Sequence, residues 1–315
     1  MTDTLQVLVP FWGDPELLYA TVESVKAQTD PRWTMTVVDD CYPDSSVGRH
    51  FAEEDDDRIT YVRNDTNLGI TGNFERCRQL ATADLVVFLG CDDLLHPSFV
   101  GRARELMAAH PDAAFLQMGV RVIDESGEDA LPLGDRIKRA LRPRPGPTRV
   151  MSGEDLAVSL LRGNWLYWPS LVFRRTRLPE SGFRADLPII LDLALVMDIV
   201  RSGGSLVVDS HEAFSYRRHT ESLSSSSALD GTRFADDRRY FREVSEQLAA
   251  DVAEERYAIA ERRQLMLQAL LEPSFTGLVA VTAQRSTSWR TLARPQPRDS
   301  KSPCHVVSSA TRMAA

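Results

Sequence analysis

The first 125 residues alternate between short apolar runs and longer segments with helical spacing. The apolar runs are rich in β-branched residues and too short for helices, and they lie at residues 5–11, 33–40, 58–64, 85–90 and 113–124. The first helical segment has Asp14 where an N-cap is expected and Pro15 at its first position. Strands separated by helix-length segments predict an α/β fold, a Rossmann-like, mostly parallel sheet flanked by helices.

Two of the predicted strands end in a pair of acidic residues. Asp39 and Asp40 end the second strand, and Asp92 and Asp93 follow the fourth. Because ligands bind outside the carboxyl ends of the strands in such sheets, both pairs are expected at one ligand crevice. Adjacent carboxylates repel unless a cation or a hydrogen-bond donor lies between them, and their oxygens can hold Mg²⁺ or Mn²⁺ against a diphosphate. A solvated turn followed by a helix cap is the alternative for either pair taken alone.

The second half of the chain has a less regular pattern. Residues 131–149 are rich in Pro and Arg and are predicted to form a long loop. A helix is predicted from about Gly153, and apolar spacing over residues 187–204 predicts another that ends near Gly203. The remaining expected elements are two short strands at 205–210 and 213–219, a charged helical stretch at 232–271 and a disordered Ser/Pro/Arg-rich tail from about residue 284.

Composition limits the partners and the compartment. The chain has 315 residues and a formal net charge of −8, which argues against nucleic acid as its main partner. The four cysteines show neither zinc spacing nor a CxxC pair, and the N-terminus lacks the pattern of a signal peptide. No apolar run approaches the ~20 residues that a membrane span requires. These features predict a soluble cytoplasmic protein with reduced thiols.

Four segments occur in an order that is typical of one family. They read VLVPFWGDPELLYATVESVKAQT, WTMTVVDDCYPD, RNDTNLGITGNFERC and LVVFLGCDDLLHPSF. In this order the chain resembles a family 2 glycosyltransferase with the GT-A fold, over roughly residues 5 to 225. The resemblance implies that the carboxyl ends of the first strands form a site for a nucleotide-sugar donor.

The resemblance also assigns roles to single residues of the donor half. The turn at Val9, Pro10 and Phe11 would contact the nucleotide, and Asp40, beside Asp39, would hold the nucleobase. The other contacts implied by the family motifs are nucleotide contacts at Asn67, Gly69 and Asn73, a ribose and metal contact at Asp92, and a metal contact at Asp93. The family's DxDD pattern has Gly90 in place of its first aspartate here, which leaves Asp92 and Asp93 to share these contacts.

In the acceptor half the resemblance points to a general base. The family commonly has Glu-Asp near the start of a helix, and here Leu191 precedes Asp192. Apolar neighbours desolvate a carboxylate and raise its pKa, which suits Asp192 as the base, although the helix dipole alone would also favour an acid there. Asp198 is the alternative base. The segment YRRHTESLS implies that Arg217, His219 and Ser222 reach the diphosphate.

Three aromatic residues before the next strand have two interpretations. Trp165, Tyr167 and Trp168 lie where the family forms its acceptor pocket, and aromatic faces stack well on sugar rings. Aromatic residues at such a position are equally expected in the core. The sequence leaves both interpretations open.

The implied activity is inverting transfer of a sugar from a nucleotide-diphosphate sugar, a UDP-sugar before others, with Mn²⁺ or Mg²⁺. The acceptor would be a carbohydrate or a lipid-linked molecule in polysaccharide, cell-envelope glycan or glycoconjugate synthesis. A nucleotidyltransferase is an alternative, but the turn VPFWGDPELL lacks the Gly-rich basic loop usual in that class. A non-catalytic nucleotide-sugar-binding protein is a second alternative.

The same interpretation divides the chain into three parts. Residues 1–227 form the glycosyltransferase domain, with a nucleotide-binding half at about 1–125 and an acceptor half at about 150–227. Residues 228–283 are expected to form a helical extension that could join copies of the chain, and residues 284–315 a disordered tail.

Basic residues cluster in two places of this acidic chain. Arg136, Lys138, Arg139 and Arg142 lie in the predicted loop, and further basic residues follow Arg285 in the tail. Such clusters attract an anionic membrane surface, which predicts peripheral contact with the inner face of the membrane. An ordinary solvated loop and tail would account for the same charges.

Overall fold

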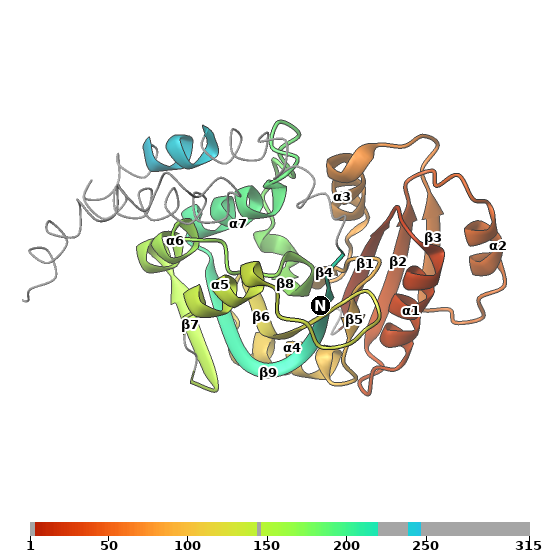
Figure 1. Ribbon diagram of the computed structural model, residues 1–315, viewed down its shortest axis with the longest axis horizontal. Helices are drawn as coiled ribbons and strands as arrows, with labels where there is room; N and C mark the ends of the chain where they lie inside the picture. The colour runs from red at the N-terminus through yellow and green to blue at the C-terminus, as the bar shows by residue number, and fades with distance from the viewer. Residues whose placement is uncertain (1–3, 144–145, 220–238, 247–315) are drawn as a thin grey trace, which may run out of the picture. The chain divides into compact units, whose positions relative to one another are not determined.

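The computed structural model describes residues 4–143, 146–219 and 239–246. Its nine described strands form one sheet in the order β3-β2-β1-β4-β8-β6-β9-β5, with β7 paired to β9 (Figure 1). The strands are β1 (Leu5–Phe11), β2 (Trp33–Asp39), β3 (Ile59–Arg63), β4 (Leu85–Phe88), β5 (Leu94–Leu95), β6 (Phe115–Ile123), β7 (Thr148–Ser152), β8 (Leu171–Arg174) and β9 (Ser205–Arg217).

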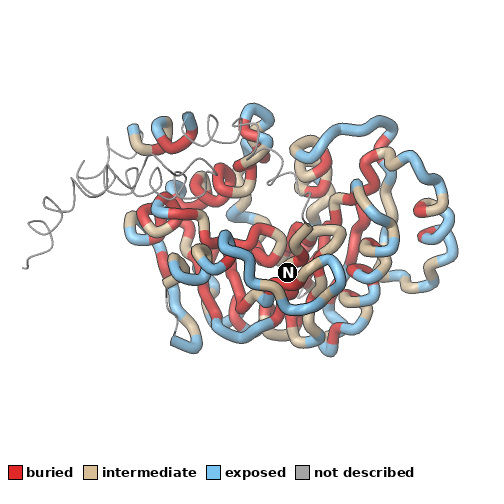
Figure 2. The backbone as a smooth tube through the Cα atoms, in the orientation of Figure 1, coloured by how far each residue is buried: buried red, intermediate tan, exposed pale blue. Residues whose placement is uncertain are grey.

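The helices lie on both faces of the sheet. They are α1 (Pro15–Lys26), α2 (Ser46–Ala52), α3 (Gly69–Leu80), α4 (Phe99–Ala109), α5 (Leu133–Leu141), α6 (Gly153–Leu161) and α7 (Leu191–Arg201), with the short 3-10 helices η1 (Trp168–Ser170) and η2 (Arg175–Arg177). Successive side chains of a strand point to opposite faces. Val7 and Val9 therefore pack with α1, α2 and α4, whereas Leu8 packs with α3, α6 and α7. Figure 2 shows the buried strands between these helical layers.

The predicted α/β fold is confirmed, and its N-terminal elements follow the sequence pattern closely. Asp14 caps α1 by accepting a hydrogen bond from the Glu16 amide at 2.9 Å, and Pro15 opens the helix. β1 pairs in parallel with both β2 and β4, and β2 pairs in parallel with β3. The sheet is mixed, however, because β8 runs antiparallel between β4 and β6.

Two predictions for the second half are wrong. The segment 131–149 contains α5 and the start of β7 rather than a continuous loop. The two short strands expected after residue 204 are one strand, β9, which runs parallel to β6 with shifts of register near Gly119. A Cβ atom at Gly119 would lie 2.8 Å from the Ser210 carbonyl oxygen, so only glycine allows the two strands to approach there. The sequence also gave no signal for α2 or β5.

The segments flanking the sheet bear on the remaining expectations. Among the described residues no helix has the length and apolar character to cross a membrane. Cys41, Cys77 and Cys91 are free thiols, whereas Cys304 lies outside the described residues. Residues 239–246 are helical, and Tyr240 packs within the core next to α7. The rest of the expected extension and the expected tail lie outside the described residues.

Candidate functional site

The parallel strands bring the predicted donor residues to one edge of the sheet. Phe11 ends β1 opposite Asp39 of β2, and β4 on the other side of β1 leads into the turn at Gly90. Local sequence supports this arrangement, because each of these strands is an apolar run followed at once by polar residues or glycine. The ends of three neighbouring parallel strands therefore define a crevice of the kind that binds ligands in α/β sheets.

The two carboxylates of the first acidic pair are both buried but have different partners. Asp39 is fully buried and accepts hydrogen bonds from the Tyr61 hydroxyl and from Arg63 Nη1, the latter at 2.6 Å. Burial and the bond to Asp39 raise the pKa of Tyr61 to about 12. Asp39 is thus held within the protein. Asp40 is 2% exposed and accepts through Oδ1 from Asn64 Nδ2 at 2.9 Å and from the Leu68 amide at 2.8 Å, so both of these hydrogen bonds fall on one carboxylate oxygen.

The turn before α3 supports Asp40. Asn67 Oδ1 accepts a hydrogen bond from the Gly69 amide at 2.8 Å, and Gly69 has a left-handed φ of 71°. Asn73 is buried, donates to the Val38 carbonyl at 3.0 Å and accepts from Asn64 at 3.0 Å. These contacts fix the turn that presents the Leu68 amide to Asp40. The roles of Asn67, Gly69 and Asn73 as direct nucleotide contacts stay predictions.

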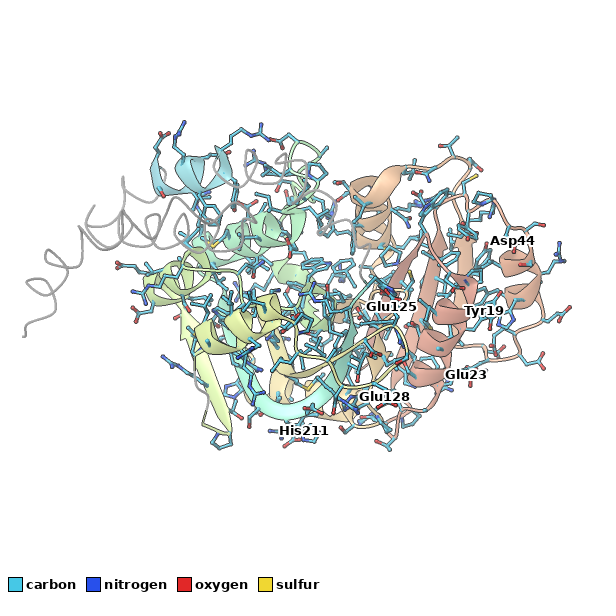
Figure 3. All side chains as sticks on the ribbon, in the orientation of Figure 1. Tyr19, Glu23, Asp44, Glu125, Glu128 and His211 are labelled. Atoms are coloured by element: carbon cyan, nitrogen blue, oxygen red, sulfur yellow. The ribbon has the colours of Figure 1, made fainter. Side chains whose placement is uncertain are left out.

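The second acidic pair meets the end of β9, more than a hundred residues later in the chain. Asp92 Oδ2 lies 2.8 Å from His219 Nε2. Asp93 is buried and accepts a hydrogen bond from the Arg217 amide at 2.8 Å. The Arg217 side chain donates to the carbonyls of Asp92 at 2.9 Å and Glu125 at 3.0 Å, so it ties the loop after β6 to the acidic pair. Figure 3 labels Glu125 on this loop. Ser222, the other predicted residue of this segment, lies outside the described residues.

Asp93 is buried among charged groups, namely Asp92, Arg217 and Arg218. Burial, together with the neighbouring charge of Asp92, raises the pKa of Asp93 well above its usual range, and the Arg217 amide opposes this only in part. A Cβ atom added at Gly90 would clash with Asp93 Oδ2 and would lie 3.0 Å from Asp92 Oδ1. Glycine at position 90 therefore lets both carboxylates turn back over the end of β4.

These residues fit a divalent cation that a substrate helps to bind. Among the described residues no three His, Cys, Asp or Glu side chains form a group that could hold a metal by themselves. Mg²⁺ sites commonly use one or two carboxylates and complete the shell with phosphate oxygens and water. Asp92 and Asp93 supply such carboxylates. His219 adds an imidazole nitrogen, which Mg²⁺ and Mn²⁺ favour less than they favour oxygen ligands.

The candidate base lies at the start of α7. Asp192 is in the first turn of that helix, and its Oδ2 lies 3.5 Å from Asn164 Nδ2. Its neighbours Leu191 and Leu193 are buried, as the sequence suggested. Asp198 lies farther along the helix with Arg201 at 3.9 Å, and burial raises its pKa.

Trp165, Tyr167 and Trp168 are buried in the core. Trp165 is fully buried, and Trp168 stacks on Phe88 with ring centroids 5.7 Å apart and an interplanar angle of 9°. Tyr167 donates a hydrogen bond to Asp135 at 3.0 Å. Trp165 and Tyr167 nevertheless also line a cavity below α5.

Sequence reasoning missed two features beside the crevice. Asp135 of α5 is buried and pairs with Arg218, whose Nη2 lies 2.8 Å away. The signal in the sequence was the position of Arg218 between Arg217 and His219, which the family resemblance assigned to the diphosphate. Trp12, half-exposed, packs edge-on against Tyr42 at 5.4 Å; Trp12 directly follows β1, and Tyr42 lies three residues after the end of β2. Cys41, between Asp40 and Tyr42, has a φ of 62°, a conformation that strains a residue other than glycine.

The sheet and the crevice define the class of protein as one with the GT-A fold. The structure is similar to that of TarS of S. aureus in complex with UDP-GlcNAc, with a TM-score of 0.64 at 15% identity over 91% of this chain and 79% of that chain. It is also similar to the mannosyltransferase PcManGT of Pyrobaculum calidifontis in complex with GDP-Man and Mn²⁺, with a TM-score of 0.58 at 16% identity over 91% of this chain and 82% of that chain. At such identities the similarity shows the fold.

Residues 6–160 match the sequence model of Glycosyl transferase family 2, and through them the chain belongs to that family. A curated relative, "Putative colanic acid biosynthesis glycosyl transferase WcaA" of Escherichia coli, is 27% identical over 95 residues, which is 30% of this chain and 34% of that protein. The chain spans between 14% and 73% of the lengths of the curated relatives it matches. The predicted family is confirmed, and the match gives no support to a nucleotidyltransferase.

Proposed function

We propose that the protein is an inverting glycosyltransferase that moves a sugar from a nucleotide-diphosphate sugar to an acceptor hydroxyl. The observation that carries this proposal is the position of Asp40 after β2 and of Asp92 and Asp93, the former in contact with His219, after β4, on the two sides of β1 in a GT-A sheet. TarS was solved with UDP-GlcNAc, so a UDP-sugar is the first donor to test. The name of WcaA supports an acceptor in polysaccharide or cell-envelope glycan synthesis.

In this proposal each carboxylate of the donor half has one task. Oδ2 of Asp40 accepts a hydrogen bond from a ring N–H of the nucleobase, while Oδ1 stays bound to the turn before α3. Asp92 and Asp93, with His219, hold Mn²⁺ or Mg²⁺, which when bound offsets the charge of the departing diphosphate. Arg217 acts by positioning, because its side chain is occupied by backbone carbonyls.

The acceptor side supplies the base. Asp192 takes the proton of the acceptor hydroxyl, whose oxygen then attacks the anomeric carbon while the bond to the diphosphate breaks. Attack opposite to the leaving group inverts the configuration at that carbon. Asn164, at 3.5 Å, holds the Asp192 side chain in place at the start of α7.

Donor binding tests the crevice directly. UDP and UDP-GlcNAc are titrated against the protein with and without Mn²⁺, and the thermal shift is recorded; a hundredfold excess over Kd stabilises by about 2.7 kcal/mol. We expect Asp93→Ala to abolish the Mn²⁺-dependent part of the shift. Asp40→Ala should weaken binding of UDP even without metal. If both variants bind like the wild type, the crevice is not the donor site.

Release of free UDP on mixing donor and acceptor separates an enzyme from a non-catalytic binding protein. Binding without release on any of a panel of glycan acceptors would favour the binding protein. Release that depends on acceptor would support transfer.

The proposal extends to contact with a membrane and to assembly of copies through the C-terminal segment. Lys138 donates to the Leu166 carbonyl at 2.7 Å and Arg142 to the Asp209 carbonyl at 3.0 Å, so two of the four basic side chains point inward. Arg136 and Arg139 are both exposed, but only Arg136 is left for a membrane surface, because Arg139 also lines the cavity below α5. Sedimentation with anionic and neutral vesicles at low salt tests this contact, and equal sedimentation with both would exclude it.

A further inference from the structure

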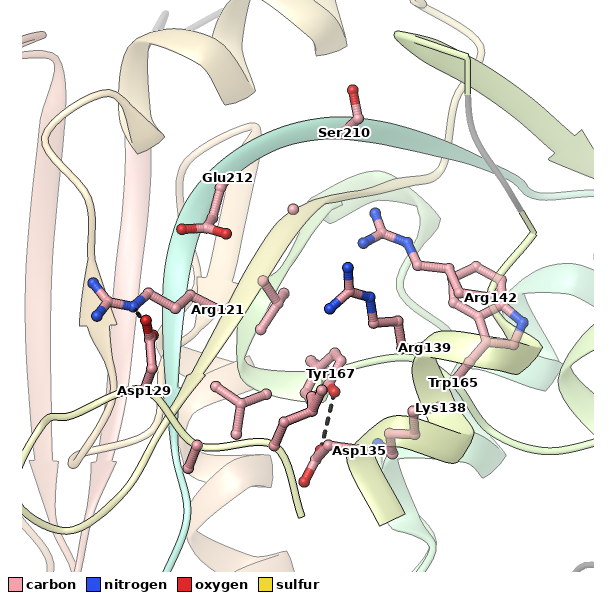
Figure 4. Close-up of a pocket in the computed structure, with 15 residues that line it drawn as sticks. Arg121, Asp129, Asp135, Lys138, Arg139, Arg142, Trp165, Tyr167, Ser210 and Glu212 are labelled. Atoms are coloured by element: carbon pink, nitrogen blue, oxygen red, sulfur yellow. Dashed lines mark hydrogen bonds and ion pairs between the residues drawn. The ribbon is translucent and has the colours of Figure 1, made fainter. Parts of the chain in front are cut away.

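A cavity of about 480 Å³ lies between α5 and the middle of β6 and β9. Figure 4 shows Arg139 and Arg142 pointing into it from α5 and its C-terminal end, with Ser210 and Glu212 on the facing strand β9. Its volume is within the range of small-ligand sites, which is about 300–1,000 Å³. No residue with a role in the proposed reaction lines this cavity.

The charges of the cavity are unevenly compensated. Arg121 pairs with Asp129, and Asp135 is neutralised by Arg218. Glu212 lies on the side of Arg121, to which it is coupled electrostatically. Each carboxylate that lines the cavity, Asp129, Asp135 or Glu212, therefore lies near an arginine.

Two guanidinium groups at the other end lack carboxylate partners. Arg139 makes no hydrogen bond or ion pair with any residue that the structure describes, although it lines the cavity. Arg142 donates through Nη2 to the carbonyls of Asp209 at 3.0 Å and Met118 at 3.4 Å, while its Nε is buried without a partner. Burial lowers the pKa of Arg142, although Tyr167 and Asp209 act in the opposite direction. A partly buried guanidinium group with a spare buried donor is stabilised by an anion placed against it.

The cavity adjoins the donor crevice through one residue. Asp135, which lines it, binds Arg218, and Arg218 lies directly between Arg217 and His219 at the end of β9. The cavity and the acidic pair are thus linked by the consecutive residues Arg217, Arg218 and His219, which contact Asp93, Asp135 and Asp92 respectively. Arginine is well suited to phosphate and carboxylate because its planar fork can donate two hydrogen bonds to either.

We propose that the cavity below α5 binds an anionic group, a phosphate or a carboxylate, of the glycan acceptor. The inference rests on the proposed function, because it names the acceptor class for the same site. Leu131, which is 47% exposed, and Val120 form the apolar part of the lining against which the sugar carrying that group packs.

The test measures binding of glucose 6-phosphate, glucuronate and glucose by titration calorimetry in the presence of saturating UDP and Mn²⁺. The nucleotide occupies the donor crevice, so phosphate cannot bind there instead. We expect at least one of the two anionic sugars to bind about tenfold or more tighter than glucose. The comparison of the two anions shows whether phosphate or carboxylate is the preferred group.

Arg139→Gln and Arg136→Gln form a matched pair on α5. Both remove one positive charge from an exposed residue of the same helix, but only Arg139 lines the cavity. Arg139→Gln should lower the affinity for the anionic sugar about tenfold and leave that for glucose unchanged, while Arg136→Gln should change neither. Equal losses in both variants, or no preference of the wild type for an anionic sugar, would overturn the proposal. An equal loss of binding to anionic vesicles in both variants would instead show a surface contact and count against the cavity.

Failure of the proposed function appears separately. It would show as absent binding of UDP and Mn²⁺, measured in the same samples before the sugars are added. The sugar titrations are then repeated without nucleotide, so the affinity of the cavity for anions is still decided.

Discussion

Asp92 and Asp93 are adjacent in the chain, yet their carboxylates have different surroundings. Asp92 is partly exposed and contacts His219, whereas Asp93 is buried below the Arg217 amide. The absence of a side chain at Gly90 is what allows both to fold back over the strand end. In this chain, glycine at the position of the first aspartate of the DxDD pattern leaves the space that both carboxylates occupy.

Gly90→Ala should separate metal binding from nucleotide binding. The new Cβ would displace the Asp93 carboxylate, so we expect the Mn²⁺-dependent affinity for UDP to fall more than tenfold, about 1.4 kcal/mol. Metal-free UDP binding should change little, because Asp40 is on another strand. Calorimetric titration with and without Mn²⁺ measures both. Gly134→Ala is the control, since a Cβ there meets no atom within 4 Å; an equal effect of the two changes would contradict the explanation.

Asp192→Asn should separate chemistry from binding. Asparagine keeps the shape but cannot take the acceptor proton, so kcat is expected to fall about 10²–10⁴-fold, about 3 to 5 kcal/mol of barrier. Donor affinity should change by less than about 1 kcal/mol, because the base faces the acceptor and not the diphosphate. Initial rates of UDP release with acceptor give kcat, and calorimetry gives the affinity. Asp198→Asn, farther along α7, should be nearly silent; if it is the more damaging change, Asp198 is the base.

At the scale of elements, the predictions succeeded where local chemistry decides the structure. α1 begins at Asp14 and Pro15 because a capping carboxylate and a proline at the first position both favour a helix start. α5 was missed because its sequence is rich in Pro and Arg at its flanks and its stability depends on a distant contact, that of Asp135 with Arg218. β9 was read as two strands because the polar residues around Asp209 interrupt it. Asp209 is buried there with Arg102 and Thr148.

Asp135→Asn should weaken the attachment of α5 to the rest of the domain. Asp135 is buried and accepts from Arg218 and Tyr167, so breaking this pair leaves a poorly compensated cation and should lower the free energy of unfolding by about 2–4 kcal/mol. Urea unfolding at neutral pH measures the change in midpoint. Asp129→Asn breaks the pair with Arg121, whose side chains are 76% and 41% exposed, and should cost about 0.5 kcal/mol or less. Similar losses in the two variants would show that Asp135 does not anchor the helix.

At the scale of the whole molecule, strand neighbours are harder to foresee than strands. The sequence pattern marked most strands, but it contained nothing that would place β8, late in the chain, between β4 and β6. For the same reason the acidic pair could be located from its strand end, whereas the approach of Arg217 and His219 was implied by the family resemblance alone. Contacts between distant segments depend on the assembled sheet, which local propensity does not encode.

The stability of the assembled domain should depend on pH through Asp30. Hydrogen bonds from Arg32 and then Arg104, with the charge of Arg104 nearby, hold the pKa of Asp30 well below its usual range. A carboxyl group whose pKa is lowered on folding stabilises the protein above its unfolded pKa, and this contribution is lost as the pH falls through the folded pKa. Asp30→Asn should therefore lower the free energy of unfolding by about 2–3 kcal/mol at pH 7, because Arg104 of α4 is buried.

The pH dependence distinguishes this contribution from a simple packing loss. The difference between wild type and Asp30→Asn, measured by urea unfolding from pH 7 downward, should be constant above about pH 5 and shrink below about pH 4. Asp112→Asn, a surface change, serves as the reference. A difference that stays the same at all pH values would show that ionisation of Asp30 has no part in it.

The segment between β6 and β7 has a consequence for protein engineering. It leaves the sheet after Ile123, forms α5, and returns at Thr148 to pair with the same strand, β9, that β6 pairs with. Among its described residues, Asp135, Lys138 and Arg142 attach it to the rest of the domain, and the Asp124 and Glu125 carbonyls accept hydrogen bonds from Arg217. The segment is therefore suited to exchange: a graft that keeps these attachments can vary the surface offered to the acceptor while the strands that carry the donor residues remain untouched.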